Sequence, residues 1–269
     1  MRNQVSHSET RKRGTSRYTI RSLAQGLEAL ERLGGAPRGL TLMELARSLR
    51  WGKATAFRYL STLVAAGYLD LDGDSRRYRP TVRVLRLGGN FLARLSLTDI
   101  ALPHLEALSR RLGETTNMAV LDEAEVVYVA RVGGKRILST NLGVGSRLPA
   151  HCTSMGKVLL AWLPEAERER ILSRARLEAF TPQTLADPAR LREALRAVRR
   201  QGYALNDQEL DLGLRSCAAP VIDARGAAVA AINASFTSAR FTRAELEKRA
   251  APAIVAAARA ISEVLVSRQ

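Results

Sequence analysis

One short basic segment carries side chains suited to contacting nucleic acid. Lys53, Thr55, Arg58 and Tyr59 recur at helical spacing in KATAFRYLSTL, which contains no acidic residue. Side chains of these types reach phosphates and base edges when their helix lies in the major groove of DNA. We therefore predict a recognition helix over residues 53–63.

Two helices and a turn are expected to position this segment. Apolar residues share one face of each helix, at Leu42, Leu45, Ala46 and Leu49 and then at Ala56, Leu60, Leu63 and Val64. Thr41, with Glu44 three residues later, predicts a capping box that starts the first helix. Gly52 supplies the backbone freedom that a tight connection needs.

A basic β-hairpin is predicted after the second helix. LDLDGDSRRYRP holds two short β-prone runs joined through an Asp-Gly turn. The order of helix, helix and hairpin predicts a winged helix-turn-helix. Helical hairpins with a few arginines also occur in proteins that bind no nucleic acid, but the basic wing favours DNA binding. The residues predicted to contact DNA are Thr41, Lys53, Thr55, Ala56, Arg58, Tyr59, Arg76, Arg77 and Arg79.

Positive charge is concentrated in the first third of the chain. The 269 residues carry a formal net charge of +16, of which residues 1–85 contribute +9, from 16 Lys and Arg against 7 Asp and Glu. Such an excess favours a polyanionic partner. An arginine-rich, lysine-poor composition is also typical of a GC-rich genome, so the remaining charge carries less weight.

Length and cysteine content indicate a globular, intracellular protein. The chain is long enough for two domains, and 46% of its residues are hydrophobic. Cys152 and Cys217 are too few for a disulfide framework, and neither a secretory signal nor an apolar span of about 20 residues is apparent. His7, His104 and His151 lie too far apart for a zinc site. We expect a cytoplasmic protein with no cofactor, metal or membrane partner.

The chain is predicted to contain four segments. Residues 1–17 are polar and basic, and we expect a disordered tail that is more a solubilising than a phosphate-binding segment. Residues 18–83 would form the winged helix-turn-helix, residues 84–97 a linker helix, and residues 98–269 a second domain. The first helix, from Tyr18 to Leu33, is expected to bury Ile20, Leu23, Leu27 and Leu30.

The second domain alternates helices with short strands. A helix from Thr98 is followed by the strands TNMAVLDE, EVVYVARV and ILSTNLGVG, and later by YALNDQEL, RSCAAPVID and AAVAAINASF. Helices are expected after HCTSMG, from Pro164 to Leu172, from Leu185 to Arg200, and from Glu245 to Val266. This order predicts an α+β fold with a central antiparallel sheet flanked by helices.

The strand-to-helix turn HCTSMGKV contains residues that could do chemistry. His151 and Cys152 are candidates for a base and a nucleophile, but neighbours on a strand point to opposite faces, so a buried structural cysteine is favoured. The turn lacks the spacing of a phosphate-binding loop. The free amides of a helix that begins near Ser154 and Met155 would instead favour a small anion such as a carboxylate.

Polar residues on the later strands are predicted to face this helix terminus. They are Asn206 or Asp207, Ser216, Asn233 and Ser235. Asn233 and Ser235 are two apart on one strand and therefore share a face. Arg131 and Arg215 are candidate counter-ions for an anion, although a surface ion pair is the default interpretation of either.

Five phrases in order resemble the IclR family of bacterial transcriptional regulators from Ile20 onward: RSLAQGLEALERL, the helix pair, HCTSMGKVLLAWLP, GYALNDQELDLGLRSCAAPVID and VAAINASF. YVARV and QELDLGLRSCAAPV look closest to the branch that regulates aromatic-acid catabolism through protocatechuate, 4-hydroxybenzoate and β-ketoadipate. The resemblance implies a winged helix that binds a palindromic double-stranded DNA operator, as a homodimer or a dimer of dimers. It also implies a C-terminal GAF/profilin-like domain that senses a small organic acid effector.

The resemblance also implies an effector site. Carried over by position, it would comprise Thr140, Ser154, Met155, Asn206, Leu214, Ser216, Asn233 and Ser235, to which we add the adjacent Asp207. The family often has an acid where this chain has Asn206, and an amide in place of a charge changes which carboxylates the site tolerates.

Two other classes of function are alternatives to a regulator. An enzyme with a basic docking module would need a carboxylate pair, a triad or a metal cluster, and the sequence shows none at usable spacing. A non-specific nucleoid or RNA binder would explain the charge but not a second domain with a polar-lined pocket. We therefore predict a sequence-specific DNA-binding regulator, not an enzyme, whose effector modulates operator binding or activation.

Overall fold

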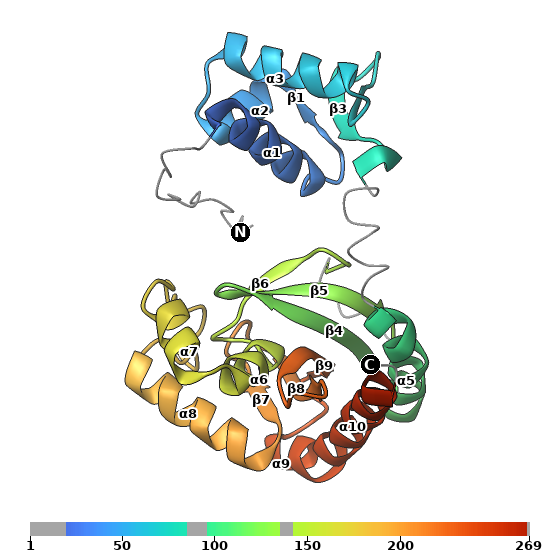
Figure 1. Cartoon of the computed structure of the whole chain (residues 1–269), viewed down its shortest axis with the longest axis vertical. Coiled ribbons are helices and arrows are strands. Elements are labelled where there is room, and N and C mark those ends of the chain that lie inside the picture. Colours follow the sequence, from blue (N-terminus) through green and yellow to red (C-terminus); the bar gives the residue numbers. More distant parts are fainter. Residues whose placement is uncertain (1–19, 85–95, 135–141, 268–269) are drawn as a thin grey trace. The chain divides into compact units, whose positions relative to one another are not determined.

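The computed structural model describes residues 20–84, 96–134 and 142–267, and the chain divides into two compact units, residues 1–91 and 92–269 (Figure 1). Each unit is described by itself. The predicted tail over residues 1–17, nearly all of the predicted linker helix over residues 84–97, and Thr140 lie outside the described residues.

The first unit is a winged helix-turn-helix, as predicted. Its helices are α1 (Arg21–Gly34), α2 (Leu42–Leu49) and α3 (Lys53–Ala65), and its strands are β1 (Leu40–Thr41), β2 (Leu69–Leu71) and β3 (Arg77–Pro80). The strands pair antiparallel in the order β1-β3-β2. A short 3-10 turn, Val82–Val84, follows β3. Strand β1 was not predicted, because two residues give no alternation pattern to detect.

Local sequence signals explain how α2 begins and ends. The hydroxyl of Thr41 accepts a hydrogen bond from the Glu44 amide (3.3 Å), and the Glu44 carboxylate accepts one from the Thr41 amide (2.8 Å), so the predicted capping box is confirmed. Arg50 ends the helix in the left-handed conformation, with φ of 55°. Leu33, Leu45 and Leu60 then form the centre of a small core.

The buried stripe predicted for α1 is only partly correct, because Leu30 is half-buried and packs against the core but the other three residues are exposed. The helix packs through Ala29 and Leu33, which are fully buried, whereas Ile20, Leu23 and Leu27 are 65%, 61% and 48% exposed. Apolar periodicity identifies residues that share a helix face, but it does not say what that face packs against. The outer face of α1 is therefore an apolar stripe without a cover in the described part of this chain.

The second unit contains a six-stranded antiparallel sheet in the order β6-β5-β4-β9-β8-β7. Its strands are β4 (Thr115–Asp122), β5 (Glu125–Val132), β6 (Arg147–Pro149), β7 (Ala204–Asp207), β8 (Leu214–Ile222) and β9 (Ala228–Thr237). The predicted strand ILSTNLGVG is not confirmed. Residues 135–141 lie outside the described part, residues 142–145 are not a strand, and β6 begins at Arg147 instead.

Helices cover both faces of this sheet (Figure 1). One layer consists of α5 (Ser96–Leu112) and α10 (Ala251–Ser267), and the other of α6 (Ser154–Trp162), α7 (Glu165–Leu172) and α8 (Pro188–Gln201). This arrangement confirms the predicted α+β class. Glycine is required at Gly156 on α6, because a Cβ atom there would lie 2.2 Å from the Ala150 carbonyl oxygen.

The final helical stretch differs from its prediction in two ways. It begins with α9 (Arg243–Glu245) and a π-helical turn, Leu246–Ala250, before α10. Contrary to the expectation of no long apolar span, Arg243–Ser267 is long and apolar enough to cross a membrane by length and composition alone. Its residues Ile254, Ala258 and Ile261 are buried in the core beside the sheet, which is typical of a core helix.

Candidate functional site

Two groups of residues are candidates for function, one in each unit. In the first unit, α3 begins after Gly52 and presents Lys53 and Arg58 to solvent, while Thr55 is half-buried. Phe57 lies on the same helix and is 55% exposed. Exposed basic and apolar side chains on one helix could contact phosphates and thymine methyl groups respectively. Phe57 was not predicted, because polar side chains were the signal for DNA contact.

Two predicted DNA-contact residues on α3 serve the core instead. Ala56 is fully buried, so its methyl group is not available to a groove, and it is withdrawn from the candidate site. The Tyr59 hydroxyl donates a hydrogen bond to Gln25 Oε1 on α1 (2.7 Å), and its ring packs against Trp51 with centroids 5.0 Å apart. Tyr59 therefore joins α3 to α1.

The wing arginines are not equivalent. Arg77 donates to both carboxylate oxygens of Glu44 (2.9 and 3.0 Å) and to the Gly39 carbonyl (2.9 Å), so it ties β3 to the start of α2. The hydrogen bond from the Thr41 amide, followed by those from Arg77, holds the pKa of Glu44 below its usual value. Arg76 is exposed in the turn, and Arg79 is exposed with only a 3.6 Å approach to Asp72. Arg76 and Arg79 are thus better placed than Arg77 to contact a phosphate.

In the second unit, polar side chains gather on the sheet face that carries α6. Asn117 Nδ2 donates to Asn233 Oδ1 (2.8 Å), and Arg131 Nη1 donates to Asn117 Oδ1 (3.2 Å). Nearby on the same sheet face, the hydroxyls of Ser154 and Ser216 are hydrogen-bonded to each other at 2.7 Å. Apart from Arg131, these side chains are buried.

Strand register explains why these residues meet. Asn117 pairs with Asn233 and with Arg131, while Ser216 pairs with Ser235. Directly paired residues on neighbouring strands point to the same face of the sheet. The prediction that Asn233 and Ser235 share a face agrees with this register, and Leu214 lies on that face two residues before Ser216.

Asn117 and Tyr128 lie on this face of the sheet but were not predicted from the sequence. Asn117 interrupts the apolar strand TTNMAVLD, which was the available signal, but its contact with Asn233 spans 116 positions. Tyr128 belongs to the apolar cluster around α6, and burial raises its pKa to about 12, so the phenol stays protonated. Arg131 makes no ion pair with a carboxylate among the described residues.

The predicted pair Asn206 and Asp207 divides between two environments. The buried Asn206 amide donates to the Cys152 carbonyl (2.7 Å) and accepts from the Glu209 amide (3.0 Å), which fixes the turn before α6. Asp207 accepts from Arg215 Nε (2.6 Å). Because Arg215 alternates with Ser216 along β8, this ion pair lies on the opposite face of the sheet. Asp207 and Arg215 are therefore removed from the candidate effector site.

A buried ion pair holds α6 to the segment that follows β7. Lys157 Nζ contacts Glu209 Oε1, and both side chains are less than 10% exposed. The second carboxylate oxygen of Glu209 is buried without a hydrogen-bond partner among the described residues. Met155, on the same helix, is fully buried in the apolar cluster and contributes packing rather than a polar contact.

The candidate nucleophile, Cys152, lies in an environment that disfavours its reactive form. Burial raises the pKa of the Cys152 thiol to about 12, so the thiolate is not available at neutral pH. Burial also lowers the pKa of His151. Among the described residues, no group of three or more His, Cys, Asp or Glu side chains is placed to hold a metal ion.

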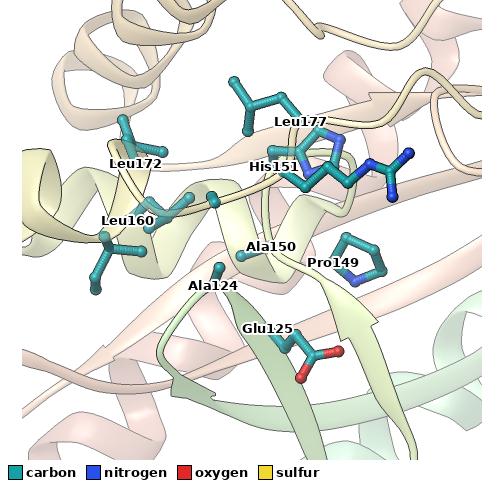
Figure 2. Close-up of a pocket in the computed structure, with 11 residues that line it drawn as sticks. Ala124, Glu125, Pro149, Ala150, His151, Leu160, Leu172 and Leu177 are labelled. Carbon is teal, nitrogen blue, oxygen red and sulfur yellow. The ribbon is translucent and has the colours of Figure 1, made fainter. Parts of the chain in front are cut away.

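A separate cavity of about 180 Å³ lies beside the turn between β6 and α6, and Ala150 and His151 of that turn line it (Figure 2). Figure 2 shows Leu160 and Leu172 at one end of the cavity, and His151 with Leu177 above Ala150. None of the predicted effector-site residues lines it.

Comparison with known proteins identifies both units. Residues 22–73 match the IclR helix-turn-helix domain, and residues 89–263 match the bacterial transcriptional regulator IclR C-terminal domain. The chain is 41% identical over 239 residues to the Pca regulon regulatory protein of Pseudomonas putida, covering 88% of this chain and 81% of the relative. It is 37% identical over 219 residues to the p-hydroxybenzoate hydroxylase transcriptional activator of Acinetobacter baylyi, covering 80% of each.

A solved structure supports the same assignment. The chain resembles an IclR homologue from Microbacterium hydrocarbonoxydans complexed with 4-hydroxybenzoate, with a TM-score of 0.77, 28% identity, and coverage of 91% of this chain and 98% of that one. The relatives are named transcriptional regulators, in agreement with the winged helix and the helix-flanked sheet described above. The chain therefore belongs to the IclR family of bacterial transcriptional regulators, with a helix-turn-helix DNA-binding domain and an effector-binding C-terminal domain.

Proposed function

We propose that this regulator responds to a small aromatic acid, of the hydroxybenzoate class, bound on the α6 face of the sheet. The observation that carries this proposal is the Arg131–Asn117–Asn233 network beside the Ser154–Ser216 hydroxyl pair. Arg131 supplies a positive charge with no carboxylate partner among the described residues, and the carboxylate of the ligand would take that place.

The neighbouring groups suit the rest of such a ligand. The Ser154 and Ser216 hydroxyls can each donate and accept, so they can bind a ring hydroxyl of either orientation. Tyr128 offers an aromatic ring and a protonated phenol. The names of two relatives and the 4-hydroxybenzoate bound by a third point to the same chemical class. Thr140, which lies outside the described residues, remains part of the proposed site, as does Ser235.

On the DNA side, we propose that residues 18–83 bind the operator through α3 and the wing. Lys53, Thr55 and Arg58 would read the groove, and Arg76 and Arg79 would hold the phosphate backbone. A palindromic operator requires two copies of the domain. The exposed stripe of Ile20, Leu23 and Leu27 on α1 supports a dimer, because a second copy of the chain could bury this apolar surface.

The proposal includes no catalytic step. The second unit would act as a cytoplasmic sensor over residues 98–269, joined to the DNA-binding domain by residues 84–97, and would use no cofactor. Ligand binding would change operator affinity by favouring one arrangement of the dimer or tetramer over another.

Isothermal titration calorimetry of the purified full-length protein with 4-hydroxybenzoate and protocatechuate tests the effector class. We expect saturable binding by the natural chain and at least about a tenfold loss in Arg131→Gln, because a hydrogen bond to a charged group is worth about 1.5–3 kcal/mol. Arg259→Gln, on the exposed surface of α10, is the matched control. Absence of binding by any hydroxybenzoate would contradict the aromatic-acid class, and unchanged binding by Arg131→Gln would remove Arg131 from the site.

A further inference from the structure

The cavity in Figure 2 has a distinct set of walls. It lies between α6, the C-terminal end of α7 with the turn that follows, and the ends of β5 and β6. Its aliphatic lining includes Leu160, Ile171 and Leu172, all buried, and Leu177. An apolar cavity of about 150 Å³ is known to be large enough for benzene. A cavity of about 180 Å³ is therefore large enough for one six-membered ring with a small substituent.

One buried polar side chain lines this cavity. His151 is 4% exposed, and its Nε2 lies 3.0 Å from the Glu178 carbonyl oxygen. Since a carbonyl only accepts, Nε2 carries the proton, and Nδ1 is an acceptor with no hydrogen-bond partner among the described residues. Burial lowers the pKa of His151, which favours this neutral form.

The other charged groups at the cavity do not compete for a ligand in the same way. The Glu125 carboxylate accepts a hydrogen bond from Arg147 Nε (2.8 Å), and Arg147 also pairs with Asp122. Arg176 is exposed at the rim. The interior therefore presents aliphatic walls and one uncharged acceptor, which is a poor environment for an anion and a suitable one for a neutral ring with a hydroxyl group.

We propose that this cavity is a second small-molecule site, which binds a neutral, phenol-sized ligand whose hydroxyl donates to His151 Nδ1. The site is separate from the proposed acid site and does not depend on it. Its occupant would touch Ala150 and His151, which lead into α6. Thr153 caps that helix by accepting from the Gly156 amide (3.2 Å), and its hydroxyl donates to the Pro149 carbonyl (3.1 Å).

Binding of 4-fluorophenol to the full-length protein, followed by ¹⁹F NMR, tests the proposal. We expect saturable binding by the natural chain. In Ala175→Leu, a larger side chain at the half-buried edge of the cavity would fill the space and weaken binding by about tenfold or more. Ala260→Leu, a half-buried alanine on α10 in the other helix layer, should bind as the natural chain does.

His151→Phe tests the hydrogen bond, and we expect about a two- to tenfold loss of affinity for 4-fluorophenol. Fluorobenzene, which lacks the hydroxyl, should bind the natural chain and His151→Phe equally. The proposal is overturned if the natural chain shows no saturable binding of 4-fluorophenol, or if Ala175→Leu binds it with unchanged affinity. Unchanged affinity in His151→Phe alone would overturn the role of the imidazole. If 4-fluorophenol bound only in the proposed acid site, its affinity would be the same in Ala175→Leu as in the natural chain.

Discussion

The two candidate sites of this chain use polar residues in opposite ways. On α3 and the wing, Lys53, Arg58 and Arg79 are exposed and hold few fixed partners. On the α6 face of the sheet, Asn117 and Asn233 are buried and hydrogen-bonded to each other. Exposed cations can bind phosphates without breaking hydrogen bonds within the protein. A buried hydrogen-bond network is pre-formed, and disturbing it lowers the stability of the fold. Substitutions in the two sites should therefore fail in different ways.

The largest contrast is expected between two lysines, each in the first turns of a helix. Lys157 on α6 is paired with Glu209 in the interior, and Lys53 on α3 is exposed. Lys157→Met leaves the Glu209 charge buried and unpaired, so we expect a loss of about 3–5 kcal/mol in the free energy of unfolding. Lys53→Met should change that free energy by less than about 0.5 kcal/mol. Urea denaturation measures both, and equal small losses would contradict the contrast.

For the exposed site, we expect the reverse pattern. Arg58→Ala should weaken binding to the operator by about 1–3 kcal/mol if the side chain contacts a base, without changing the unfolding midpoint. Fluorescence anisotropy with operator and scrambled duplexes measures the affinity and the sequence preference. Arg200→Ala, on the C-terminal end of α8, is a control for the loss of one positive charge. An unchanged affinity and an unchanged preference would remove Arg58 from the DNA contact.

Thr41 was predicted to contact DNA, but its hydroxyl is engaged at the start of α2. We expect Thr41→Ala to lower the free energy of unfolding by about 1 kcal/mol through loss of the helix cap. Thr41→Ser keeps the hydroxyl and should restore stability. Thermal unfolding compares the two variants. If both keep full stability while both lose operator affinity, the threonine methyl group contacts DNA and the capping explanation fails.

The smallest contrast lies within the wing. Arg77→Ala breaks the bonds to Glu44 and Gly39 and should cost about 1 kcal/mol of stability. Arg79→Ala should leave stability unchanged and reduce the salt dependence of DNA binding by about one unit in the slope of log affinity against log salt. Identical effects of the two substitutions on the salt slope would show that the wing arginines are interchangeable.

The sequence predicted helices and strands more accurately than it predicted which residues contact each other. Capping, apolar periodicity and the Asp-Gly hairpin located α2, α3 and the wing, because each signal lies within a few residues of the element it controls. The burial predicted for Ile20, Leu23 and Leu27 on α1 was wrong, because no residue in the described part of the chain covers them. Ala56 shows a related limit, since its place on the apolar face of the helix was predicted correctly and its assignment as a DNA contact was not.

The effector side shows where sequence reasoning stops. Alternation in β9 placed Asn233 and Ser235 on one face, but the hydrogen-bond partner of Asn233 lies on β4, 116 positions away. Asn117 meets Asn233 only because β4 lies beside β9, and Asp207 leaves the site only because the register places it opposite Arg215. Strand order and register are tertiary properties, so a list of polar residues could not be sorted by face without them.

The most direct test of the account is whether a buried network in one unit controls the affinity of an exposed surface in the other. The measurement is fluorescence anisotropy of an operator duplex, selected from a random pool, with and without saturating 4-hydroxybenzoate, for the natural chain and for Arg131→Gln. We predict that the ligand changes the operator affinity of the natural chain several-fold, and that Arg131→Gln binds the operator equally well but does not respond. A full response by Arg131→Gln, or no response by the natural chain, would contradict the account.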